Sequence, residues 1–276
     1  MTKPWAKIKK AEWQEFVKVW RNLRPPWKPS AERIRIYRQL IKKYVKGDKA
    51  LVLGATPEIR DLLAELKFKV TLLDINPGMV KAMTYLRKTK SREKAVIGDW
   101  LTGNPGTEYD LVIGDSNICN LLTKFYGRFF RHVNELLKDK GVFICQSAVS
   151  AKPLAEHRIS IREIIKKAKY KPDYYENYLN RAHDYLKWVV SHTKRNVVNW
   201  GELNEIWRQK LKDGQISKKE FKLLDFGLPK KLILSFLNEK TFIGILKRHW
   251  QIITEKHEQT HRVYKDFYRI YILKKK

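Results

Sequence analysis

The chain of 276 residues has little cysteine and no long apolar run. Its two cysteines, Cys119 and Cys145, have no neighbouring cysteine or histidine at a metal-ligand spacing. The sequence therefore indicates neither a disulfide framework nor a zinc site, and we expect no metal. No stretch approaches about 18 uninterrupted apolar residues, and the first residues lack the apolar region of a signal peptide. We expect a cytoplasmic protein without membrane insertion.

Acidic residues are scarce as well. The 29 Asp and Glu residues face 58 Lys and Arg residues, which gives a formal net charge of +29. Residues 1–50 have 15 basic and 4 acidic residues, residues 51–150 have 14 and 11, and residues 151–276 have 29 and 14. A basic protein of this kind suggests a polyanion such as RNA as a partner. Because the middle of the chain is nearly balanced, the excess belongs to its flanks.

The first 47 residues have the pattern of two basic amphipathic helices. Apolar side chains recur at positions i, i+3, i+4 and i+7 from Trp13. Ser30 is suited to cap a second helix, which ends before Gly47. We expect both helices to pack on the core of the protein.

From residue 48 onward, short apolar segments alternate with amphipathic helical segments. This pattern predicts a doubly wound α/β fold with a mostly parallel sheet, seven-stranded once two strands at the C-terminus join it. The helical patterns of residues 150–249 interrupt this alternation. The predicted units are N-terminal basic helices (1–47), an α/β core (48–149), a helical insertion or lid (150–249) and C-terminal strands that complete the sheet (250–276).

Ligands of such sheets bind beyond the carboxyl ends of the strands, so the residues that follow each strand are the site candidates. Gly54 lets the backbone approach a ligand, and the free amides at the helix start after it favour a carboxylate or phosphate. Asp74 lies about twenty residues after Gly54, and an acid at this spacing in such folds binds the two hydroxyl groups of a ribose. The other two strand ends carry Gly98-Asp99-Trp100 and Gly114-Asp115-Ser116-Asn117.

In order and spacing, LVLGAT, LLD, GDW and YDLVIGDSN resemble the motifs of class I, Rossmann-like S-adenosylmethionine-dependent methyltransferases. PPWKPS, LGATPE and DINPGM narrow the resemblance to a subgroup with an LGxTPE-type first motif and poorly defined substrates. The resemblance implies S-adenosylmethionine as cofactor and S-adenosylhomocysteine as product. It implies that Gly54, Ala55 and Thr56 line the methionine moiety, Asp74 binds the ribose, Ile75 and Met79 flank the adenine, Gly98, Asp99 and Trp100 bind the adenine edge, and Asp115, Ser116 and Asn117 border the sulfonium and the acceptor.

The sequence departs from the family pattern at two places. Val52 occupies the position of an acid that normally helps to hold the cofactor's amino group, and Thr56 and Glu58 replace the later glycines of the first motif. The role of the acid therefore passes elsewhere, and the PPWKPS segment is one candidate. The Asn/Asp-Pro-Pro-Tyr signature of many amino-methylating enzymes is absent after the fourth strand, which leaves the acceptor atom open.

Three functional hypotheses remain. In the first, which we slightly prefer, the helical insertion encloses a small-molecule acceptor. In the second, the basic flanks bind tRNA or rRNA as the substrate. In the third, the chain is a non-catalytic binding or scaffold protein on a methyltransferase fold. If the reaction needs a base, Asp115 is the first candidate and His157 the second, with Asn117 as a further catalytic candidate.

Overall fold

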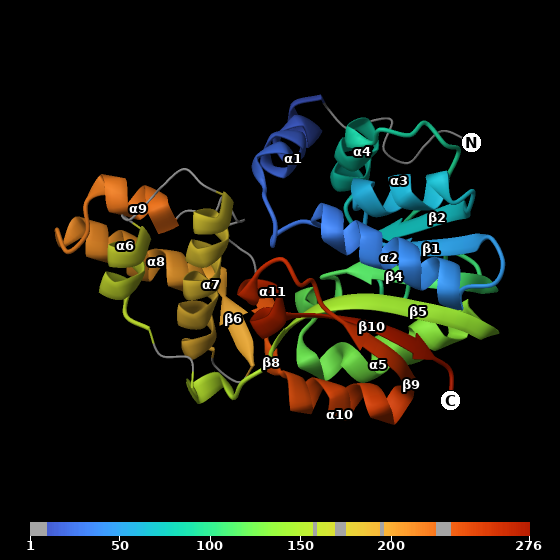
Figure 1. Cartoon of the computed structure of the whole chain (residues 1–276). Helices are drawn as coiled ribbons and strands as arrows, with labels where there is room; N and C mark the ends of the chain where they lie inside the picture. The colour runs from blue at the N-terminus through green and yellow to red at the C-terminus, as the bar shows by residue number, and fades with distance from the viewer. Residues whose placement is uncertain (1–9, 157–158, 169–174, 194–195, 225–232) are drawn as a thin grey trace.

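The structure is a computed structural model, and it describes residues 10–156, 159–168, 175–193, 196–224 and 233–276 (Figure 1). Its centre is an eight-stranded sheet in the order β3-β2-β1-β4-β5-β10-β9, with β8 paired to the end of β5. The strands are β1 (Lys49–Leu53), β2 (Lys69–Asp74), β3 (Lys94–Ile97), β4 (Tyr109–Asp115), β5 (Leu137–Ser150), β8 (Leu237–Asn238), β9 (Gln251–Lys256) and β10 (Tyr268–Lys274).

The strand directions confirm the doubly wound α/β fold. The neighbours among β1 to β5 pair in parallel, whereas β10 is antiparallel to both β5 and β9. The expected number of seven strands is wrong by one, because the short strand β8 adds to the sheet beside β5. The central strands are apolar on both faces, so each face needs a covering layer of helices.

Helices cover both faces of the sheet (Figure 1). One face packs against α2 (Ala31–Tyr44), α3 (Pro57–Glu65) and α4 (Pro77–Leu86), and the other against α5 (Tyr126–Leu136) and α10 (Glu239–His249). The N-terminal helix α1 (Lys10–Asn22) lies against α4. Ser30 caps α2 as expected, since its Oγ atom accepts a hydrogen bond of 3.0 Å from the Arg33 backbone N–H.

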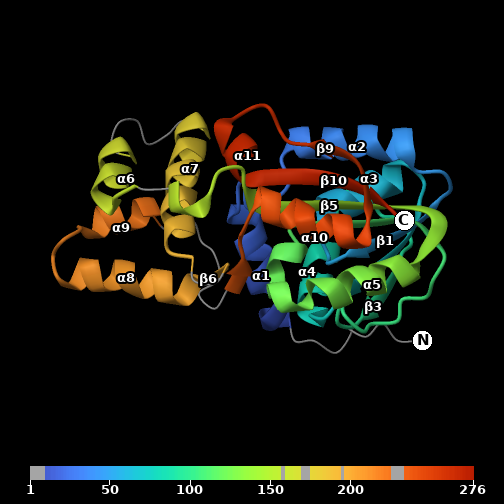
Figure 2. The same ribbon diagram turned by 90° about the horizontal axis from the view of Figure 1, so that it is seen from below.

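A further group of helices lies beyond the end of β5, beside the sheet in both views (Figures 1 and 2). Its core combines aliphatic side chains with buried aromatic rings, among them Trp188, Trp200 and Trp207. The sequence predicts only helices in residues 150–249, but β8 and two further short strands also lie there. These strands pair only with partners far along the chain, which a local pattern does not reveal. The elements are α6 (Ile161–Ala168), α7 (Tyr175–Ser191), β6 (Val197–Asn199), α8 (Trp200–Lys212), α9 (Lys218–Leu224) and β7 (Ile233–Ser235), and α11 (Arg262–Phe267) follows β9.

Candidate cofactor and acceptor site

The turn after β1 lies beside the end of β2 and has a backbone conformation that favours glycine. Gly54 follows β1 with φ +98°, and its N–H donates to the Leu73 carbonyl at 2.8 Å. A Cβ atom on Gly54 would stand 3.7 Å from the Trp100 ring and 4.0 Å from Asp74 Oδ2. The structure thus brings together three of the residues that the sequence assigns to the cofactor.

Asp74 is a buried carboxylate that is only partly hydrogen-bonded. Its Oδ1 atom accepts the Asn76 N–H at 2.8 Å, and Asn76, not Asp74, caps α4. No described residue donates a hydrogen bond to its Oδ2 atom. Burial raises the pKa of Asp74 to about 6, against the lowering effects of the Asn76 N–H and the Arg60 charge. An oxygen in this state is suited to accept hydrogen bonds from a bound diol.

The turn after β3 is rigid and lies beside this acid. Trp100 Nε1 donates to the Leu73 carbonyl at 2.8 Å, and Asp99 Oδ1 accepts the Leu101 N–H at 2.8 Å. A Cβ on Gly98 would stand 3.3 Å from the Gly103 Cα atom, so the turn is closely packed.

The two residues expected to flank an adenine differ in their exposure. Ile75 is 66% exposed, more than any other large apolar side chain in the described part of the chain, and Met79 is half-buried against the core under α4. An apolar side chain in water directly after a strand end is a surface that a flat ring can cover.

The turn from β1 into α3 departs from the expected anion site. Ala55 is buried, and its carbonyl accepts a 3.1 Å hydrogen bond from Arg60 Nη1. Thr56 stands at the N-cap but makes no capping hydrogen bond. Instead, Glu58 Oε1 at the second position of α3 accepts a hydrogen bond of 3.1 Å from Trp20 Nε1. A carboxylate of the chain itself therefore stands at this helix start.

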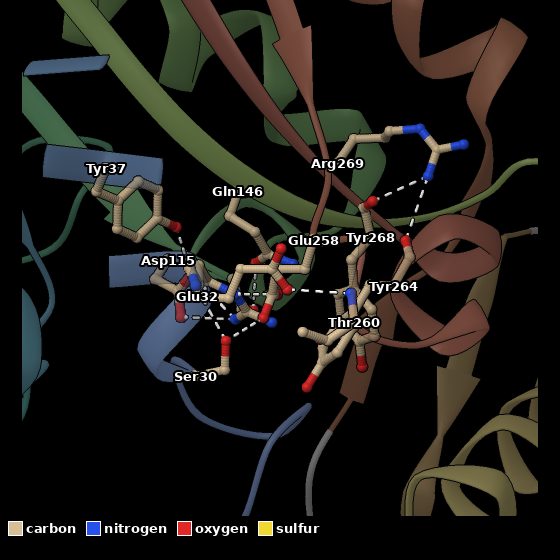
Figure 3. Close-up of polar contacts among 12 residues, drawn as sticks. Ser30, Glu32, Tyr37, Asp115, Gln146, Glu258, Thr260, Tyr264, Tyr268 and Arg269 are labelled. Carbon is tan, nitrogen blue, oxygen red and sulfur yellow. Dashed lines mark hydrogen bonds and ion pairs between the residues drawn. The ribbon is translucent and has the colours of Figure 1, made fainter. Parts of the chain in front are cut away.

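At the end of β4, Asp115 takes part in a buried ion-pair network (Figure 3). Arg33 Nη1 lies 3.2 and 3.1 Å from its two carboxylate oxygens, and the Tyr37 hydroxyl donates to Oδ1 at 2.5 Å. Arg33 Nε donates to Glu258 Oε2 at 2.8 Å, and the Ser30 hydroxyl donates to Glu258 Oε1. The network joins α2, β4 and the segment after β9 around one guanidinium.

The charged groups of this network shift the pKa values of their neighbours. Although burial lowers the pKa of Arg33, the carboxylates of Asp115 and Glu258 raise it well above its ordinary value. Burial, followed by the Asp115 charge, raises the pKa of Tyr37, and burial raises that of Glu258. Both Asp115 oxygens accept hydrogen bonds from a guanidinium that stays charged. This arrangement suits a carboxylate that holds α2 to the end of β4.

Ser116 and Asn117 form a constrained turn after Asp115. Ser116 has φ +58°, and its hydroxyl and N–H donate to the side chain and backbone oxygens of Gln146 at 2.6 and 3.1 Å. Asn117 is 2% exposed, yet neither atom of its amide group has a hydrogen-bond partner in the described residues. Its amide lies over Gly114, where a Cβ would be 2.3 Å from Asn117 Oδ1. A buried amide without a partner points to a ligand group.

The sequence did not indicate Arg33, Tyr37, Gln146 or Glu258 as members of the site. Arg33 and Tyr37 lie on the same face of α2 at spacing i, i+4. A charged residue on an otherwise apolar helix face can indicate that it has a buried partner. Glu258 has no local signal, because it lies 225 residues from Arg33. His157, the second candidate base, lies outside the described residues.

No group of three or more His, Cys, Asp or Glu side chains in the described part of the chain is placed to hold a metal ion. None of its helices is long and apolar enough to cross a membrane.

Several solved structures share this fold at low sequence identity. A putative zinc-dependent alcohol dehydrogenase from Rhodobacter sphaeroides is similar with a TM-score of 0.60 and 13% identity, over 98% of this chain and 100% of that one. A S-adenosylmethionine-dependent methyltransferase from Clostridium acetobutylicum has a TM-score of 0.52 and 12% identity, over 98% and 93% of the two chains.

A third similar structure is the 1,6-didemethyltoxoflavin-N1-methyltransferase of Burkholderia thailandensis, solved with 1,6-didemethyltoxoflavin and S-adenosylhomocysteine bound. Its TM-score is 0.54 at 11% identity, over 95% of this chain and 86% of that one. Neither a scan of protein-family models nor a search of curated proteins gives a match. At these identities the likeness shows a shared fold, and that fold is the Rossmann-like fold of solved S-adenosylmethionine-dependent methyltransferases.

Proposed function

We propose that the protein is a S-adenosylmethionine-dependent methyltransferase. The observation that carries the proposal is the buried Asp74 carboxylate, whose Oδ2 atom lies beside Gly54, 4.0 Å from where a Cβ on that residue would stand. The exposed Ile75 that follows it suits an adenine face, and the Trp100 ring lies 3.7 Å from the same Cβ position. An acid for a diol, a glycine for close approach and apolar surface for a base fit an adenosine cofactor.

The chain's own residues then have simple tasks. The bound cofactor supplies an electrophilic methyl group, and its leaving group needs no protonation. Asp74 holds the ribose, and the turn of Ser116 and Asn117, fixed by Gln146, borders the acceptor. Asn117 offers a buried donor and a buried acceptor to orient the acceptor atom. Such an enzyme works mainly by alignment and by electrostatic preorganisation.

For the acceptor, we propose a small molecule. The methyltransferase from Burkholderia thailandensis was solved with a small acceptor bound, and it has this fold. Stacking platforms for RNA need exposed aromatic rings. In the described part of the chain, Trp188, Trp200 and Trp207 are packed inside the helical group, and the one exposed large aromatic side chain is Tyr85.

Calorimetric titration with S-adenosylhomocysteine tests the cofactor. We expect the wild-type protein to bind it and Asp74→Asn to bind at least about 30-fold more weakly, since a charge-assisted hydrogen bond is lost. Asp48→Asn is the matched control, because Asp48 is exposed and pairs with Lys69 at the opposite ends of β1 and β2. Absence of binding to the wild-type protein would refute the proposal.

The acceptor class needs separate measurements. A filter-binding titration with tRNA and rRNA fragments at low salt supports the RNA alternative if affinity is high and falls steeply with salt. Methyl incorporation across a panel of small amines, phenols and heterocycles supports the small-molecule acceptor. Cofactor binding without turnover on any of these substrates would favour the non-catalytic alternative.

A further inference from the structure

One side of the protein has exposed cations without acidic partners. It consists of the outward sides of α5 and α10, which lie next to each other over one face of the sheet (Figures 1 and 2). In the described part of the chain, none of these cations forms an ion pair. We call this set the basic face, and its exposed members are Arg128, Arg131, Lys240, Lys247, Arg248 and Lys276.

The amphipathic pattern of the two helices produces this arrangement. Their buried apolar side chains belong to the core on that face of the sheet, so the polar sides of both helices point to solvent. Each helix has one acid. Glu239 Oε1 lies 2.7 Å from Arg269 Nε, and Glu135 Oε2 lies 3.6 Å from His132 Nδ1. Neither acid is paired with a cation of the basic face.

Several of these cations converge near one end of α10. His249, the last residue of this helix, lies against Phe130 of α5 with the ring centroids 5.6 Å apart. Burial and the charges of Arg131, Arg248 and Lys276 lower the pKa of His249. Cations from α5, from α10 and from the residues after β10 are therefore within electrostatic reach of one imidazole, and they repel one another.

The helices on the other face of the sheet differ in this respect. Every arginine of α2 has an acidic partner: Arg33 pairs with Asp115 and Glu258, Arg35 lies 3.7 Å from Glu32, and Arg38 pairs with Glu65 of α3. No arginine of α5 or α10 has one among the described residues. The unpaired state of the basic face is therefore a local property and not a mere consequence of the formal net charge of +29.

The chemistry of the basic face favours a planar anionic partner. Two helices that pack on a sheet spread their cations in two directions, as headgroups are spread in a membrane surface, and arginine matches a phosphate group. Nucleic-acid surfaces commonly add exposed rings for stacking or an element that enters a groove. The exposed large apolar and aromatic side chains of the described chain are Ile75, Tyr85, Ile206 and Ile233, and none of them lies in α5 or α10. Docking through this face therefore depends on charge.

We infer that the basic face docks the protein on membrane surfaces rich in anionic phospholipids, through charge and without insertion. Asp74 and Asp115 lie at the carboxyl ends of β2 and β4, outside the basic face. The docked protein therefore keeps the candidate cofactor and acceptor site outside the docking surface. The inference does not depend on the proposed function.

Vesicle sedimentation with the full chain tests the inference. Vesicles of equal parts phosphatidylglycerol and phosphatidylcholine are compared with vesicles of phosphatidylcholine alone, at about 0.05 M and about 0.3 M salt. The test variant is Arg131→Gln with Arg248→Gln. The matched control is Arg35→Gln with Arg38→Gln, which removes the same charge from exposed positions of α2.

We expect the wild-type protein to bind the anionic vesicles at the lower salt concentration and to be released at the higher one. A cation near such a surface contributes about fivefold in affinity, so the test variant should bind about 25-fold more weakly and the control less than about 3-fold. Equal losses in both variants, or no wild-type binding at the lower salt concentration, would overturn the inference. It would also be overturned by tRNA binding that is tighter than vesicle binding and is lost in the test variant, since the basic face would then be a nucleic-acid surface.

Discussion

Replacing Asp74 by Asn should make the protein more stable while it weakens the proposed cofactor binding. The pKa of Asp74 rises from its ordinary value of 3.8 to about 6 on folding, because the carboxyl group is buried. One pKa unit corresponds to about 1.4 kcal/mol, so the ionised group costs the folded state up to about 3 kcal/mol. Asn keeps an oxygen for the Asn76 N–H, which Asp74 accepts at 2.8 Å, and it carries no charge.

The contribution of Asp74 to stability depends on pH, because its pKa is higher in the folded state than in the unfolded state. Such an acid has no effect on stability while it is protonated in both states, and it destabilises the folded state once it is ionised. The penalty of Asp74 is therefore absent below about pH 4, grows as the pH rises from about 4 to 6, and is complete above pH 7. We expect Asp74→Asn to raise the free energy of unfolding by up to about 3 kcal/mol at pH 7.5 and by about half of that at pH 5.

Urea unfolding of both proteins at the two pH values, without ligand, measures this difference. In a second series, S-adenosylhomocysteine at 100 times its wild-type dissociation constant should stabilise the wild-type protein by about 2.7 kcal/mol and the Asp74→Asn variant by less than about 1 kcal/mol. A destabilised variant, or a stability difference that does not change between pH 5 and 7.5, would show that folding does not raise the pKa of Asp74.

Three further outcomes are expected. Arg33→Met should lower the free energy of unfolding by about 3 to 5 kcal/mol in urea, because it leaves two buried carboxylates without their cation, whereas Arg38→Met at a surface ion pair should cost less than about 1 kcal/mol. Gly54→Ala should cost about 1 to 2 kcal/mol, because φ is +98°, and abolish S-adenosylhomocysteine binding in calorimetry. Cys119 and Cys145 are fully buried and burial raises the pKa of Cys119 to about 12, so a thiol reagent at pH 8 should react with both only after unfolding.

The sheet and the strand-end residues were predictable because their signals are local. A buried parallel strand is an apolar run, and the residue that follows it is placed at the sheet edge by the strand itself. Gly54, Asp74 and Trp100 meet for this reason, although they belong to three different strand ends. The strand β8 escaped prediction because two residues carry no periodic pattern, and only its pairing with β5 makes it a strand.

The network around Arg33 was not predictable in this way. Its guanidinium pairs with Asp115 and Glu258, which lie 82 and 225 residues away along the chain. A charged residue on an apolar helix face indicates that a partner exists, but the partner is set by how β9 and β10 return to the sheet. The role of Asp115 changed for the same reason: taken alone it is an acid at a strand end, and in the fold it is the anion of an ion pair.

The pairing of β8 with β5 bears on how such a protein can diversify. Val149 and Ser150 lie opposite Leu237 and Asn238, so the chain leaves the sheet and returns to it at neighbouring positions. Whatever lies between, residues 151–236, is attached through two adjacent backbone strands, and a short loop can join these ends at little entropic cost. Segments of other lengths can therefore replace this one while the strand order is kept, and under the proposed function the choice of acceptor can change separately from the cofactor site.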